Sequence, residues 1–271
     1  MQKIIHMEEL MKRLIYLAVV LVLVFALAAC SASSDHLAAM KKAGKMVVGT
    51  SADYPPFEFV DEAGNTTGFD VELMNEIGKR LGVTVEWTDM PFDSLIAAVQ
   101  GGKIDLSIAA FNYDEERDKT VDFTDAYYTS EDALVVLETL SGDVPTPENL
   151  DKFVVGVQSG TTQDGWLTDN YEATGKLTAD TLLRYERVDQ AFMDLQAGRV
   201  QVIMADYVPA KALVDQFGGM KIVYQGVLST GPMNIVIPDG DKNLQTEINK
   251  IIKELQDEGF IDALAVKYFA E

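Results

Sequence analysis

Residues 99–104, Val-Gln-Gly-Gly-Lys-Ile, are echoed 96 positions later by residues 195–200, Leu-Gln-Ala-Gly-Arg-Val. In both copies an amphipathic helix ends at glycine, a basic residue follows, and a β-rich strand begins. A second echo pairs Val47–Ser51 with Val154–Gln158. Helix–glycine–strand is a common construction, so coincidence is one interpretation. The other is a chain built of two similar α/β lobes.

Strand-like and helix-like segments alternate from Lys45 onward, which predicts an α/β architecture with mostly parallel sheets. We expect strands at 45–50, 83–87, 104–109, 153–157, 200–205 and 234–237. We expect helices at 69–81, 93–99, 162–171, 188–197, 207–217 and about 244–269. Asp70 is the expected N-cap of the first helix, and Gly82 its stop. Because ligands of open α/β sheets bind beyond the carboxyl ends of strands, Ala110 and Asp206 would face each other across one cleft.

The composition narrows the class of protein. The 271 residues are 48% hydrophobic and 24% charged, which fits a folded chain with one large domain or two modest ones. The formal charge of −21 argues against nucleic acid as a partner, since phosphate binding needs clustered Lys and Arg. No P-loop, nucleotide-type glycine fingerprint or His/Cys metal cluster occurs in the sequence, so we expect no cofactor and no metal.

The beginning of the chain reads as an export signal. Lys12 and Arg13 precede an apolar run at 14–29, after which the sequence turns polar. This run is shorter than the roughly 20 apolar residues that a spanning helix requires. We therefore interpret residues 1–29 as a signal peptide and exclude them from the fold.

Cys30 ends this run and is the single cysteine of the chain, so it has no partner for an internal disulfide. An incidental cysteine in a leader is one interpretation. The other is a bacterial lipobox, because Leu-Ala-Ala-Cys at 27–30 looks like a site where the cysteine is acylated. Acyl chains would anchor the protein outside the cytoplasmic membrane. We expect residues 30–44 to be the lipidated cysteine and a tether.

The segment Gly68-Phe69-Asp70-Val71-Glu72-Leu73 resembles the signature of the family 3 extracellular solute-binding proteins, the polar amino-acid receptors of ABC importers. The resemblance covers nearly the whole mature chain and includes 54–58, 104–105, 117, 122–124, 159–162 and 267–269. It implies a type II periplasmic-binding-protein fold, with two α/β lobes joined by two hinge strands and the ligand in the cleft between them. Lobe 1 would be 45–130 plus 232–271, and lobe 2 would be 131–231. The crossings would fall near Leu134–Leu137 and Gly231–Asn234.

The same resemblance implies a site for both charged groups of a free amino acid. From composition alone, Arg117 reads as a solvated side chain in a charged run, but its position matches the family's carboxylate-binding arginine. Its planar guanidinium could hold both carboxylate oxygens. Asp206 matches the ammonium partner; the other interpretation is an N-cap for the helix that follows, and both roles could coexist. The Ala110 carbonyl, next to Ala109, would be a second acceptor.

The remaining predicted contacts come from both expected lobes. Residues 159–164 follow a strand and open a helix, and the free N–H groups at a helix N-terminus can bind an anion. We expect Thr161 or Thr162, beside Gln163, to bind the carboxylate of the ligand. The other interpretation is that these threonines only cap the helix, with Asp164 as the capping-box partner of Thr161. The other predicted contacts are Tyr54 and Phe92, which would sandwich the ligand side chain; Asn112, where the family has a hydroxyl; and Ser51 and Gln158 in the side-chain subpocket. Basic-ligand relatives often carry an acid at the Ser51 position, so Ser51 mildly favours a neutral polar ligand.

The sequence thus predicts a monomeric, non-enzymatic binding protein that delivers an amino acid to an ABC transporter permease. Two alternatives stay open. The first is a sensor module that uses the same pocket. The given sequence ends at Glu271 without a signalling domain, which argues against this alternative. The second is a carboxylate-based dehydratase, since some dehydratases share this fold.

Overall fold

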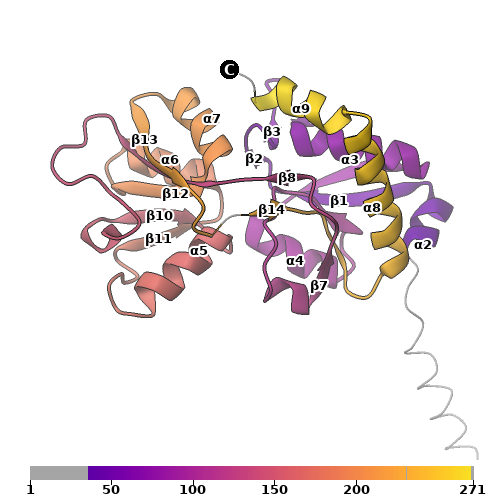
Figure 1. Cartoon of the computed structure of the whole chain (residues 1–271), viewed down its shortest axis with the longest axis horizontal. Coiled ribbons are helices and arrows are strands. Elements are labelled where there is room, and N and C mark those ends of the chain that lie inside the picture. The colour runs from indigo at the N-terminus through magenta and orange to yellow at the C-terminus, as the bar shows by residue number, and fades with distance from the viewer. Residues whose placement is uncertain (1–35, 230, 270–271) are drawn as a thin grey trace, which may run out of the picture. The chain divides into compact units, whose positions relative to one another are not determined.

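The computed structural model describes residues 36–229 and 231–269, all of which belong to the compact unit His36–Glu271 (Figure 1). Its described helices are too short or too polar to cross a membrane. The described elements gather around two five-stranded sheets.

The first sheet has the strand order β5-β1-β6-β15-β7. Its strands are β1 Lys45–Thr50, β5 Thr84–Asp89, β6 Leu106–Ser107, β7 Val121–Phe123 and β15 Val236–Pro238. Side chains of β1 alternate between two cores, because successive residues of a strand point to opposite faces. Met46 and Val48 pack with α3 Phe69–Leu81, α8 Lys242–Asp257 and α9 Phe260–Phe269. Val47 packs with α4 Phe92–Gln100 on the other face.

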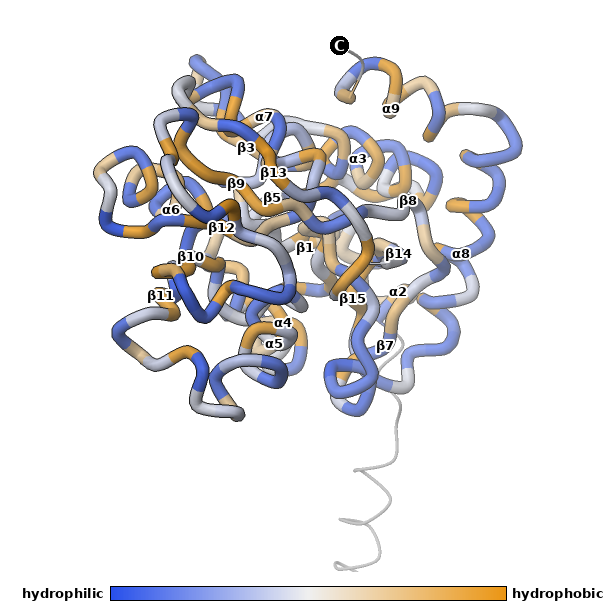
Figure 2. The backbone as a smooth tube through the Cα atoms, turned by 60° about the vertical axis from the view of Figure 1, so that its left-hand side comes forward, coloured by the Kyte–Doolittle hydropathy of each residue, from blue (hydrophilic) through white to orange (hydrophobic). Residues whose placement is uncertain are grey.

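The second sheet has the corresponding order β11-β10-β12-β9-β13. Its strands are β9 Asp132–Leu137, β10 Val155–Gln158, β11 Leu182–Tyr185, β12 Val202–Asp206 and β13 Met220–Gly226. Helices α6 Val188–Gln196 and α7 Tyr207–Phe217 pack with residues of one face, and α5 Thr162–Leu167 packs with those of the other. Figure 2 shows apolar sequence along the inner strands β9 and β12, in contrast to the more polar outer helix α8.

The remaining elements are short. A three-stranded sheet is formed by β2 Asp53–Tyr54, β3 Glu58–Val60 and β4 Thr66–Thr67. Helical turns lie at Arg117–Lys119 and Leu150–Lys152, and a π-helical turn at Thr168–Glu172 continues α5. β8 Tyr128–Thr129 pairs with β14 Pro232–Met233 where the chain passes between the two large sheets (Figure 1).

The two echoes in the sequence mark equivalent elements. The segment α4–β6 carries the first copy of the longer echo and α6–β12 the second; β6 and β12 are both the third strand of their sheets. β1 and β10, which carry the shorter echo, are both the second strand. Every strand of the second sheet lies within 131–231. The lobe boundaries themselves stay a prediction.

The expectation of mostly parallel sheets is confirmed, because in each large sheet only the fourth strand, β15 or β9, runs antiparallel to its neighbours and the other four share one direction. Several other sequence-based expectations about these elements are wrong. The strand expected at 104–109 is reduced to Leu106–Ser107. The C-terminal helix is two helices, because Gly259 adopts a positive φ of 72° between α8 and α9. Residues 36–43, expected in the tether, form helix α2 His36–Ala43, which buries Met40.

The expected crossing at Leu134–Leu137 is also misplaced. These residues lie inside β9, which is paired on both sides within the second sheet. The passage between the sheets instead includes β8, before β9 begins. The apolar run at 134–137 belongs to an interior strand of the second sheet and not to a hinge.

Asp70 is not the N-cap of α3. That position belongs to Gly68, whose φ of 133° favours glycine and where a Cβ would lie 2.1 Å from the carbonyl oxygen of Phe57. Asp70 lies inside the helix and is fully buried. Its carboxylate accepts a 2.8 Å hydrogen bond from the backbone N–H of Ala110, which has a strained φ of 47°. Asp70 therefore holds a loop between the sheets.

Candidate functional site

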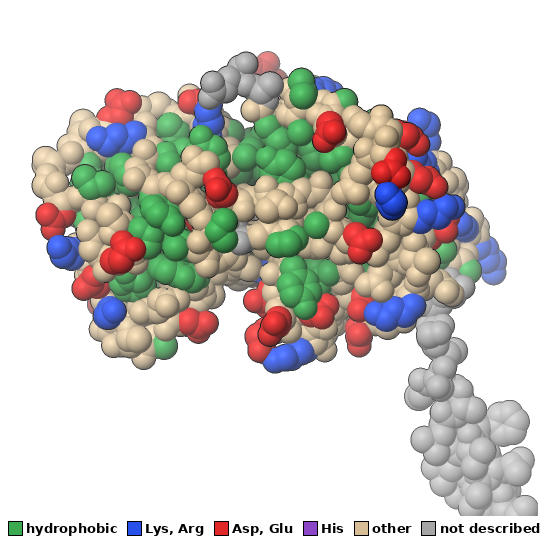
Figure 3. Space-filling view, in the orientation of Figure 1, with side chains coloured by type: hydrophobic (Ala, Val, Ile, Leu, Met, Phe, Trp, Pro, Cys, Tyr) green, Lys and Arg blue, Asp and Glu red, His purple; other side chains and the backbone are tan. Residues whose placement is uncertain are grey.

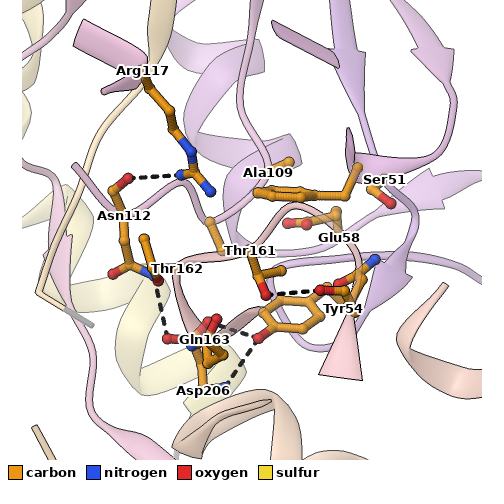
Figure 4. Close-up of a pocket in the computed structure, with 13 residues that line it drawn as sticks. Ser51, Tyr54, Glu58, Ala109, Asn112, Arg117, Thr161, Thr162, Gln163 and Asp206 are labelled. Carbon is orange, nitrogen blue, oxygen red and sulfur yellow. Dashed lines mark hydrogen bonds between the residues drawn. The ribbon is translucent and has the colours of Figure 1, made fainter. Parts of the chain in front are cut away.

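A small pocket lies between the two sheets. It is lined by Ser51, Tyr54, Glu58, Phe92, Ala109, Ala110, Asn112, Arg117, Gln158, Thr161, Thr162, Gln163 and Asp206. Every residue predicted to bind the ligand is among them, and Glu58 is the lining residue that the prediction lacked. Figure 4 shows Arg117 and Asn112 on one side of this pocket and Ser51 and Glu58 on the other. Contact with a ligand stays a prediction for each of these residues.

Arg117 projects into the pocket from the helical turn Arg117–Lys119. Its Nη1 donates to the Asn112 carbonyl at 3.0 Å, and its Nη2 donates to the Gly160 carbonyl at 2.7 Å. The guanidinium carbon lies 5.6 and 5.7 Å from the ring centres of Phe92 and Phe111. Burial lowers the pKa of Arg117, but an arginine still stays charged. Within 36–229 and 231–269 it pairs with no carboxylate, so its charge is available to an anion.

Asp206 ends β12 and is 3% exposed. Its Oδ2 accepts a 2.6 Å hydrogen bond from the Tyr54 hydroxyl, and its Oδ1 accepts a 3.5 Å bond from Asn112 Nδ2. The residue stands at the N-cap position of α7, but its side chain makes no capping bond. Burial raises the pKa of this carboxyl group to about 6, although the hydrogen bond from Tyr54 lowers the pKa and offsets part of the rise. Such a group gains from a cation that enters the pocket.

Helix α5 begins at the pocket. Thr161 is its N-cap and accepts a 3.2 Å bond from the Asp164 N–H, while the Asp164 carboxylate accepts from the Gly160 N–H at 3.0 Å. The predicted capping is therefore confirmed for Thr161. The N–H groups of the first helical turn have no partner within the helix. Thr162 Oγ1 and Gln163 Nε2 are buried without a hydrogen-bond partner among the described residues. These groups are suited to receive a polar ligand.

A hydrogen-bonded wall closes another side of the pocket and joins the two sheets. Asp53 accepts from Ser51 Oγ at 2.6 Å and from Gln158 Nε2 at 3.2 Å. Arg187, from the segment before α6, lies 3.3 Å from Asp53 and makes two bonds of 2.8 and 2.9 Å to Asp89. Burial raises the pKa of Asp53, and these partners oppose the shift. Asp53, Asp89 and Arg187 are not among the predicted site residues, since nothing in their local sequence shows that they meet.

The space-filling view shows a notch at the lower edge between the two halves of the molecule (Figure 3). The bonds of Arg117 to Gly160, Tyr54 to Asp206 and Arg187 to Asp89 all join groups from the two sides of the pocket. These contacts tie the two sides of the pocket together. Among the described residues, no group of three or more His, Cys, Asp or Glu is arranged to hold a metal ion.

Comparison with protein families gives a match over residues 46–271 to the bacterial extracellular solute-binding proteins, family 3. Two curated relatives match over most of their length. The arginine-binding extracellular protein ArtP of Bacillus subtilis is 32% identical over 262 residues, which cover 96% of this chain and 98% of ArtP. The L-cystine-binding protein TcyJ of Escherichia coli is 29% identical over 230 residues, covering 85% and 84%.

Solved structures with the same fold include a mutant of ArgBP from T. maritima, with a TM-score of 0.81 and 36% identity over 87% of this chain and 100% of that one. An ancestral arginine-binding protein bound to arginine has a TM-score of 0.78 and 37% identity, covering 84% and 99%. An ancestral arginine-binding protein bound to glutamine has a TM-score of 0.77 and 37% identity, covering 84% of this chain and 99% of that one. These proteins therefore share the two-sheet architecture with this chain.

Proposed function

This chain belongs to the family 3 bacterial extracellular solute-binding proteins, and from that premise we propose that it captures one free amino acid between its two lobes. The α/β architecture is the type II periplasmic-binding-protein fold predicted from the sequence. Curated relatives are named for the binding of arginine, cystine and histidine. A receptor for amino acids is the function that these similarities support.

The pairing of Arg117 with Asp206 across one pocket is the observation that carries this proposal. A free amino acid bears a carboxylate and an ammonium group on the same carbon. Arg117 has no acidic partner among the described residues, and Asp206 is buried with hydroxyl and amide donors only. A zwitterion would supply the missing opposite charge to both groups at once. The Ala110 carbonyl, in the same pocket, would accept a hydrogen bond from the ammonium group, and the Thr162 hydroxyl would donate one to the carboxylate.

The affinity expected for such a ligand is micromolar or somewhat tighter. An amino acid has roughly ten heavy atoms, each contributing about 0.8–1 kcal/mol within known ligand-efficiency limits. Relatives that bind basic amino acids often carry an acidic residue at the position of Ser51, so the serine mildly favours a neutral polar ligand. The complex of an ancestral arginine-binding protein with glutamine is compatible with that class. Tyr54 and Phe92 would enclose the ligand's side chain.

We propose that the closed, loaded form delivers its ligand to an ABC importer without catalysing a reaction. A bound ligand that contacts both lobes favours the closed state by its differential affinity. A dehydratase is the competing function, because one solved structure similar to this chain is described as an ancestral amino acid-binding protein and a precursor of cyclohexadienyl dehydratase. Incubation with prephenate or arogenate, followed by mass spectrometry, would reveal product if this second function were correct.

A thermal-shift screen of the twenty amino acids tests the proposed function. A ligand at a hundredfold excess over its Kd stabilises the folded protein by about 2.7 kcal/mol, which corresponds to a shift of several degrees. At least one amino acid is expected to produce such a shift with saturation. A screen in which no amino acid raises the melting temperature would contradict amino-acid capture.

Ligand binding is expected to compact the molecule. Contacts such as the one between Arg187 and Asp89 must break when the lobes separate. Small-angle X-ray scattering of the protein with a saturating amino acid should give a smaller radius of gyration than without it. Identical profiles under the two conditions would count against closure on the ligand.

We propose export and lipid anchoring from Cys30, which lies outside the described residues. Replacing Cys30 by serine removes the thiol to which an acyl chain would be attached. The variant is expected to move from the membrane fraction to the soluble fraction outside the cytoplasm, as judged by fractionation and immunoblotting. Unchanged membrane association of the variant would argue against lipidation at this residue.

A further inference from the structure

Asn112 lines the pocket from a backbone segment that lies beside β14, where the chain passes between the two large sheets. Its backbone forms an antiparallel bridge to Met233. The backbone groups of the residues before and after it bond to those of Asn234 and Pro232, at 2.8 and 3.0 Å. Asn112 itself is buried. These neighbouring bonds do not involve its side chain, so we expect the segment to keep its place when that side chain is changed.

The side-chain amide of Asn112 meets two groups of opposite hydrogen-bonding character. Its Oδ1 accepts a 3.0 Å hydrogen bond from the backbone N–H of Gly231, and its Nδ2 donates a longer bond of 3.5 Å to Asp206 Oδ1. A backbone N–H only donates and an ionised carboxylate only accepts, so these two partners fix the orientation of the amide. The amide therefore acts as a spacer between the backbone at Gly231 and the carboxylate at the end of β12.

The backbone carbonyl of Asn112 holds the other charged group of the pocket. Arg117 Nη1 donates a 3.0 Å hydrogen bond to this carbonyl oxygen. Figure 4 draws the contacts of Asn112 with the Arg117 guanidinium on one side and with the Asp206 carboxylate on the other. One residue thus contacts both groups that would bind a zwitterion. The separation between the guanidinium and the carboxylate is spanned by the carbonyl and the amide of that residue.

From this arrangement we propose that Asn112 is a positioning residue that sets the separation of Arg117 and Asp206, and thereby selects α-amino acids over zwitterions with a longer spacing. The inference rests on the proposed function, since it takes these two side chains as the partners of the carboxylate and the ammonium group. In an α-amino acid both groups are attached to one carbon, which fixes their separation. Two partners held at the matching separation bind that spacing and disfavour one that is a methylene group longer.

Direct donation from Asn112 to the ligand's carboxylate is the competing role, because the family has a hydroxyl side chain at this position. The variant Asn112→Ser separates the two roles. A serine hydroxyl can donate to a carboxylate, but its single oxygen lies one bond closer to the backbone than the amide atoms and cannot reach both Gly231 and Asp206. The variant should therefore keep its binding properties if residue 112 only donates to the ligand. It should lose selectivity for the spacing if Asn112 positions the charged groups.

The experiment is calorimetric titration of the full protein with two probes. One is the α-amino acid that gives the largest thermal shift among the twenty, and the other is its β-homologue, which has one more methylene group between the ammonium and the carboxylate. The unmodified protein is expected to prefer the α-amino acid by about a hundredfold. In Asn112→Ser this preference should fall about tenfold or more, because Asp206 is then free to meet the longer ligand.

The possible results of this comparison are distinct. An equal loss of affinity for both probes would show a merely structural role for Asn112 and overturn the proposal. Unchanged affinities for both probes would overturn it in favour of direct donation. Either result leaves amino-acid capture intact, whereas a failure of the unmodified protein to bind any of the twenty amino acids would overturn the proposed function as well.

A matched variant and a second measurement complete the test. Asn170→Ser makes the same change at an exposed asparagine that does not line the pocket and whose amide donates to the Trp166 carbonyl, and it should alter neither affinity. A crystal structure of the unmodified protein with the α-amino acid decides the proposal even if Asn112→Ser does not fold. Asn112 Nδ2 should lie closer to Asp206 than to the ligand's carboxylate, with Oδ1 still bonded to Gly231. An Nδ2 that lies closer to the ligand's carboxylate would overturn the proposal.

Discussion

Replacing Arg117 by alanine is expected to weaken amino-acid binding by about a hundredfold or more. Each hydrogen bond to a charged group contributes about 1.5–3 kcal/mol, and the guanidinium fork would make two to the carboxylate. The site is shielded by the rings of Phe92 and Phe111, so water replaces these bonds poorly. The Gly160 carbonyl would also lose the donor that reaches it from across the pocket. Calorimetry with the ligand identified in the amino-acid screen measures the loss.

Two further variants give this prediction its controls. Arg117→Lys keeps the positive charge but lacks the planar fork, so it is expected to recover only part of the affinity. Arg80→Ala removes an arginine that pairs with Glu76 and Glu258, away from the pocket, and should leave the affinity unchanged. Binding by Arg117→Ala that equals the unmodified protein would remove Arg117 from the site.

Replacing Asp206 by asparagine is expected to lower the affinity at least tenfold while leaving the unliganded protein as stable or more stable. The ligand's ammonium group would lose its ionic partner. In the empty protein, however, the buried carboxylate opposes folding, because its pKa rises from 3.8 to about 6. A shift of about 2 pKa units corresponds to a destabilisation of up to about 3 kcal/mol in the free energy of unfolding, and the neutral asparagine would remove it.

The same shift fixes a pH dependence. A carboxyl group whose pKa is higher in the folded than in the unfolded protein destabilises the fold in its ionised form. The contribution of Asp206 to unliganded stability should therefore fall as the pH rises from about 4 to about 6 and stay low above that. The affinity for the ligand should instead rise with pH up to about pH 6, because the ligand's ammonium group pairs with the ionised carboxylate of Asp206. Both trends should disappear in Asp206→Asn.

Thermal denaturation and calorimetry of the two proteins between pH 4 and pH 8 provide the comparison. A variant that binds as tightly as the unmodified protein would place the ammonium group elsewhere. A variant that loses affinity and also becomes much less stable would indicate that Asp206 is a structural residue, held for its bond with Tyr54.

Regular elements were largely predictable because their periodicity is local. The helix Phe69–Leu81 and the strand Lys45–Thr50 have the expected bounds. The errors arise where distant contacts decide. Asp70 looks like a helix cap in its local sequence, but its carboxylate accepts a hydrogen bond from the backbone N–H of Ala110, 40 residues away. The run at 134–137 looks like a crossing but acquires partners on both sides only when β12 and β13 are in place.

The candidate site was predicted mainly through its resemblance to a family, since isolated residues such as Arg117 looked ordinary in their charged surroundings. The structure brings the predicted residues into one pocket. Glu58 was missed although it stands between Phe57 and Phe59, an unusual setting for a charge. Arg187 could not be predicted, because its partners Asp53 and Asp89 are far away in sequence.

A crystal structure of the protein with the amino acid that stabilises it most tests the account most directly. It should show the ligand between the two sheets, with its carboxylate oxygens within hydrogen-bonding distance of the Arg117 guanidinium and its amino group against Asp206. A ligand bound outside this pocket, or one whose carboxylate and amino group contact neither residue, would contradict the claim that these two side chains hold a zwitterion.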